Sequence, residues 1–121
     1  MTELASTMMP REIASQAAEA IHALNHLATE GGELTSPGEV SDIIASLGQM
    51  GRDLPQLCEH LARFLVAQTE DGQVAHDAGQ EPGDSVTEVI EALAAAGQAA
   101  DMMTAALDEA HRASAELRSA R

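Results

Sequence analysis

Aromatic residues are almost missing from this 121-residue sequence, which has no tryptophan, no tyrosine and a single phenylalanine, Phe64. Valine and isoleucine are also few, whereas alanine recurs throughout the chain. Strands favour aromatic and β-branched side chains, and alanine has the highest intrinsic helix propensity. The composition therefore predicts an all-α fold.

Lysine is absent as well, and six arginines stand against 20 acidic residues, giving a net charge of −14. Nucleic acids and anionic membranes both attract basic surfaces, so this balance excludes direct binding to either. The lone cysteine, Cys58, excludes an intramolecular disulfide. The sequence has no apolar run of about 18–20 residues and no signal-peptide pattern, so we expect a cytoplasmic protein.

Apolar residues recur every three to four positions in four stretches, which we interpret as helices. The expected ranges are about 10–30, 37–51, 54–71 and 85–119. Between the middle two, Pro55 cannot donate to the carbonyl of Gly51, which predicts either two helices joined by a tight corner or one strongly bent helix. We expect a single domain, a small antiparallel up-down bundle of three to four helices with a long C-terminal helix.

Turn and capping residues set the expected boundaries. Ser36-Pro37-Gly38-Glu39 combines an N-cap serine, a proline at the first helical position and a glutamate at the third. Ser85 and Glu88 form a second such pattern, with Asp84 as a competing cap, and Gly31-Gly32 is typical of a helix end. Residues 72–84 predict a loop, which either binds something or spans the distance between helix ends.

The last helix carries apolar and small residues at alternating spacings of four and three, a heptad pattern. They are Val89, Leu93, Ala96, Ala100, Met103, Leu107, Ala110, Ser114 and Leu117. So many small side chains indicate a neighbouring helix that approaches closely. That neighbour lies either within the same bundle or in a second chain, and all of these residues except Ser114 are our interface candidates.

The residues that could carry chemistry do not combine into a catalytic pattern. His22 and His26 form a metal-compatible pair at i, i+4, but two ligands do not complete a tetrahedral site, and both fall on the predicted outward face. Cys58 falls on an apolar helix face, with His60 on the other side of that helix, which predicts a small buried hydrophobe rather than a nucleophile. We therefore expect no cofactor, no bound metal and no enzymatic activity.

Alanine buries little apolar area, so a chain of this composition has a thin core and gains from pairing with another chain. This predicts a non-enzymatic protein–protein interaction module, a self-associating accessory or regulatory protein that forms a homodimer. An alternative consistent with the charge is an acidic mimic of nucleic acid, which would block a DNA- or RNA-binding partner.

Length and helical content also resemble those of the small dimeric helical hairpins that type VII secretion exports from high-GC bacteria. That family carries a W-x-G turn and a tyrosine in its export signal. This sequence has neither residue type, and Gly48 to Gly51 provide only a Gly-x-x-Gly corner. The resemblance implies an exported helical hairpin as a further alternative.

Overall fold

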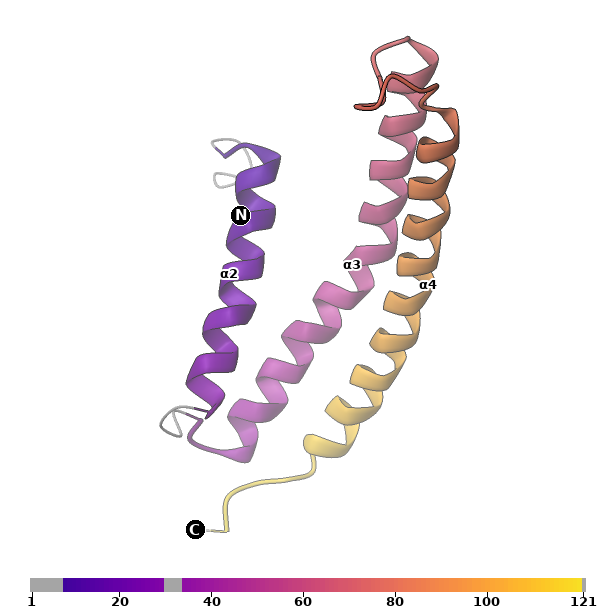
Figure 1. Cartoon of the computed structure of the whole chain (residues 1–121). Helices are drawn as coiled ribbons and strands as arrows, with labels where there is room; N and C mark the ends of the chain where they lie inside the picture. The colour runs from indigo at the N-terminus through magenta and orange to yellow at the C-terminus, as the bar shows by residue number, and fades with distance from the viewer. Residues whose placement is uncertain (1–7, 30–33, 121) are drawn as a thin grey trace.

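The computed structural model describes residues 8–29 and 34–120, and all regular secondary structure in these ranges is helical. The helices are α2 (Pro10–Thr29), α3 (Pro37–Glu70) and α4 (Gly83–Ser114); α3 packs along α4, and α2 packs against α3 (Figure 1). This confirms the predicted all-α class. In this part of the chain, none of the helices has both the length and the apolar composition needed to cross a bilayer.

Helix α3 begins where the sequence predicts. Ser36 is its N-cap, and its Oγ accepts a hydrogen bond from the Glu39 N–H at 3.2 Å. The Glu39 carboxylate reaches back to the N–H of Thr35 at 2.7 Å. These bonds satisfy donors that a helix start would otherwise leave unpaired.

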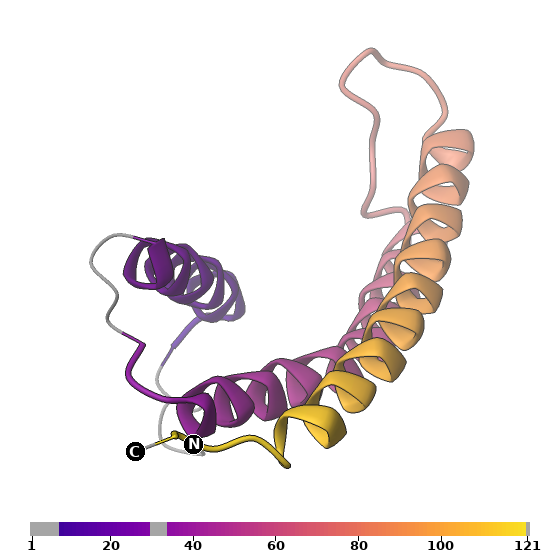
Figure 2. The ribbon, with the colours of Figure 1, turned by 90° about the horizontal axis from the view of Figure 1, so that it is seen from below.

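Helix α3 then continues through Pro55 to Glu70, so the alternative of two separate helices at 37–51 and 54–71 is wrong, and the chain forms one helix across Pro55. A helix tolerates the loss of one backbone hydrogen bond when tertiary packing supports it. That support comes from α4, since a Cβ built on Gly97 would lie 3.6 Å from Pro55 Cα. Figure 2 shows α3 and α4 curving together along their lengths.

The end of α3 is a glycine-based cap. Gly72 has a φ of 73°, and the Gln73 N–H donates to the Gln68 carbonyl at 2.9 Å. The Gly72 N–H donates to the Thr69 carbonyl at 3.1 Å, which completes a Schellman motif. The following loop folds back onto the hairpin end, where Val74 and His76 line a small cavity with Leu65 and Val86.

Helix α4 differs from the prediction at both ends. It starts at Gly83, with Pro82 as N-cap and no capping side chain, so the capping pattern predicted at Ser85 is wrong. The Val86 N–H, which donates to the Pro82 carbonyl at 2.9 Å, already belongs to the first turn. The helix ends at Ser114 rather than near residue 119.

Helices α3 and α4 form an antiparallel hairpin along a seam of mainly small residues spaced alternately by three and four. On α3 the buried and half-buried seam residues are Ser41, Ile44, Gly48, Gly51, Pro55, Cys58, Ala62, Leu65 and Thr69. On α4 they are Val86, Ile90, Leu93, Gly97, Ala100, Thr104, Leu107 and Ser114. Two contacts show how closely the helices approach: Ser114 Oγ lies 3.0 Å from Ser41 Oγ, and a Cβ on Gly51 would lie 2.3 Å from Thr104 Oγ1.

Helix α2 packs only against the N-terminal part of α3. Ile21, Leu24 and Ala28 line a cavity of about 220 Å³ together with apolar α3 residues that include Val40 and Leu47. Most other α2 residues are exposed to solvent. The expected helix end at Gly31-Gly32 lies outside the described residues.

Candidate interaction surface

A second apolar row runs along α3 beside the seam, again with alternating spacings of three and four. It consists of Val40, Ile43, Leu47, Met50, Leu54, Leu57, Leu61 and Phe64. Helix α2 contacts this row at its N-terminal end. Its C-terminal four members, from Leu54 to Phe64, are 38% to 65% exposed. We call these four the large row.

Helix α4 has a matching outer row of much smaller side chains. It consists of Val89, Ala92, Ala96, Ala99, Met103, Ala106, Ala110 and Ala113, all of them exposed. We call these eight the small row. Alanine occupies six of the eight positions, so α4 presents mainly methyl groups where α3 presents bulky side chains.

The large row and the small row lie on the same side of the hairpin. On the opposite side, a groove is lined jointly by Glu59 of α3 and by Ala94 and Asp101 of α4. In an antiparallel pair, residues flanking the seam on one side of each helix meet each other. Leu61 and Ala96 flank the seam on the other side, so together the two rows form one continuous surface, which we call the apolar face.

The apolar face is free of charge, although the protein is strongly acidic. No member of either row is charged, whereas the opposite side carries Glu59, Arg63, Glu91 and Asp101 among others. Figure 2 shows α2 on the inner side of the curve made by α3 and α4, and it is the outer row of α3 that α2 contacts. The two cavities beside α2 are lined by residues of α3 but by none of α4, so α2 covers the N-terminal end of the α3 row and not the small row.

The structure divides the predicted interface residues into two groups. Leu93, Ala100 and Leu107 lie in the seam against α3, so part of the predicted heptad packs within the chain. Val89, Ala96, Met103 and Ala110 are exposed members of the small row, and Leu117 lies beyond the helix end at 62% exposure.

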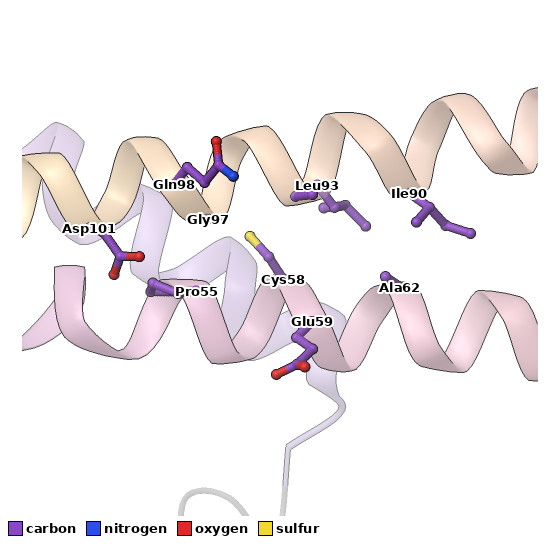
Figure 3. Close-up of a pocket in the computed structure, with 10 residues that line it drawn as sticks. Pro55, Cys58, Glu59, Ala62, Ile90, Leu93, Gly97, Gln98 and Asp101 are labelled. Carbon is purple, nitrogen blue, oxygen red and sulfur yellow. The ribbon is translucent and has the colours of Figure 1, made fainter.

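The groove on the polar side has a volume of about 380 Å³ and contains Cys58 (Figure 3). Cys58 is half-buried in the seam, and Figure 3 shows its side chain directed toward α4. Carboxylates from Glu59 and Asp101 and the amide of Gln98 also line the groove, but no histidine does. The arrangement gives the thiol no histidine base within the groove.

The metal-compatible pair His22 and His26 is exposed on α2. Among the described residues, no cluster of three or more histidine, cysteine or acidic side chains has a geometry that could hold a metal ion. Glu19, three residues before His22, is also exposed, and Glu30, four residues after His26, lies outside the described residues.

The apolar periodicity of the sequence predicts helix over most of α3 but does not separate the seam from the large row. Residues at alternating spacings of three and four occur in two adjacent registers on α3, and only packing shows which one faces α4. Side-chain size was the available signal, because closely packed helices require small residues at the contact.

The chain matches no known protein family, no curated protein and no solved structure.

Proposed function

We propose that this protein is a non-enzymatic interaction module that associates with itself through the apolar face. The observation that supports this most directly is the contrast between buried and exposed apolar residues. In the described part of the chain, the hydrophobic residues that are buried are only Val86 and Ala100, while Leu57, Leu61 and Phe64 are each at least half exposed.

Burying these exposed apolar side chains in a contact with another chain lowers the free energy. Fully burying a leucine or phenylalanine side chain stabilises a protein by about 1.5–3 kcal/mol. The small seam between α3 and α4 recovers little of this, because glycine, alanine and serine bury little apolar area. A contiguous exposed apolar surface bordered by charge is typical of a protein contact site.

Replacing Leu61 by glutamate tests the proposal. In a dimer formed through the apolar face, L61E places a carboxylate in an apolar contact and should raise the dimer dissociation constant at least about thirtyfold. Analytical ultracentrifugation measures this constant, and circular dichroism confirms that the variant remains helical.

Val66→Glu is the matched control, because Val66 is partly exposed on the same helix but lines the polar side with Glu59 and Glu70. V66E should leave the dissociation constant within about twofold of the parent value. A parent protein that sediments as a monomer at tens of micromolar contradicts the proposed function, as does equal weakening by L61E and V66E.

A further inference from the structure

The apolar face is asymmetric in a way that specifies how two copies fit together. Its α3 half carries large side chains, Leu54 to Phe64, and its α4 half at the same level carries mainly alanine. A large row packs well on a small row, whereas two large rows leave gaps and two small rows make little contact. The face is therefore complementary to a second copy that presents its rows in the opposite order.

We propose that the face binds a second copy of this chain about a two-fold axis parallel to the helices. This rests on the proposed function, and it specifies the arrangement. Rotation about such an axis places α3 of one copy on α4 of the other, so that the contact between a large row and a small row occurs twice in the dimer. A two-fold axis across the helices instead places α3 on α3, with large rows in contact.

The charge distribution indicates which surface two copies of this acidic chain would use to meet. Each copy carries −14, so two copies repel wherever their charged surfaces meet. The apolar face has no charged member, which makes it the surface where like molecules approach at least electrostatic cost. It also continues an existing helix contact. The large row is the C-terminal half of the apolar α3 row, and α2 contacts the N-terminal half of that same row.

The hairpin register predicts which residues meet across the axis. Within one chain Ser41 lies beside Ser114, and Pro55 lies beside Gly97. Counting along both helices from these contacts places Leu61 at the level of Ala92. A two-fold axis parallel to the helices preserves this level, so Leu61 of one copy should face the partner's Ala92.

Disulfide trapping tests the arrangement. In a background with Cys58→Ala, one variant carries Leu61→Cys and another carries Ala92→Cys, and the two are mixed and mildly oxidised. A mixed disulfide should form in at least about tenfold greater yield than disulfides within either variant alone. The pair Leu57→Cys with Ala96→Cys repeats the measurement at the next level, and Val66→Cys with Ala92→Cys is the negative control.

The outcomes separate the two proposals. Sedimentation of the parent protein as a monomer overturns the proposed function itself. A dimer that forms L61C–L61C or L57C–L57C disulfides preferentially overturns this arrangement in favour of α3 on α3, while self-association stands. A dimer that gives no mixed disulfide at either level also overturns the arrangement.

Discussion

At the scale of single residues, the close approach of α3 and α4 depends on Gly51. Its position leaves no room for a side chain, because an added Cβ would lie 2.3 Å from Thr104 Oγ1, and that hydroxyl is held by the Ala100 carbonyl at 2.8 Å. Gly48 is equally buried, yet its Cβ would come no nearer than 3.5 Å to the end of the Asp108 side chain. Two glycines three residues apart therefore have different roles.

This difference predicts opposite effects of the same substitution. Alanine improves the helix propensity of either position by up to about 1 kcal/mol. At Gly51 overpacking costs about 1–3 kcal/mol, so G51A should lower the free energy of unfolding, whereas G48A should raise it. Urea unfolding at one fixed protein concentration measures both, since association shifts apparent stability.

Adding Thr104→Ala to G51A removes the clashing hydroxyl and should recover part of the loss. If G51A is as stable as G48A, the two helices do not approach as closely as the structure shows.

At the scale of elements, local sequence signals predicted helix ends only where nothing competed with them. Ser36 acts as the predicted N-cap, and the predicted loop begins at Gly72, whose positive φ follows the end of α3. The pattern at Ser85 to Glu88 looks equally good in the sequence, but α4 begins at Gly83 and places Ser85 inside its first turn. With this earlier start, Val86 lies in the first turn of α4, where it is buried beneath the loop and Leu65.

The two serines therefore provide a matched pair. Ser36→Ala removes the acceptor of the Glu39 N–H and should lower the free energy of unfolding by about 1 kcal/mol. Ser85→Ala removes no capping hydrogen bond and should change it by less than about 0.5 kcal/mol. Thermal unfolding followed by circular dichroism compares them, and an equal loss from S85A would show that α4 starts where the sequence predicted.

The division of α3 into a seam and a large row could not be predicted from periodicity. Ile44 and Leu47 both belong to apolar rows with the same spacing, and so do Cys58 and Leu61. Two adjacent rows make a helix that is apolar over a wide arc, and the pattern alone does not indicate which row contacts α4. Pro55 shows the same limit of local sequence signals. A proline usually breaks a helix, but α3 continues through Pro55, which packs against Gly97 of α4.

At the scale of the whole molecule, apolar contact and charge repulsion act in opposite directions. The large row and the small row favour association, while a charge of −14 on every copy opposes it. Ion pairs within the hairpin, such as Arg52 with Asp108 at 3.1 Å, are about half exposed and offset little of this repulsion. Self-association should therefore be sensitive to ionic strength.

Added sodium chloride should strengthen the dimer. Raising ionic strength from 0.01 M to 1 M shortens the screening length from about 30 Å to about 3 Å, which weakens the repulsion between two acidic copies but leaves the uncharged apolar face intact. The dissociation constant should then fall at least about threefold. An acidic mimic of nucleic acid behaves in the opposite way, because screening weakens its attraction to a basic partner. Sedimentation across a salt series measures the sign of this dependence, and a dimer that dissociates as salt rises would contradict association through an uncharged surface.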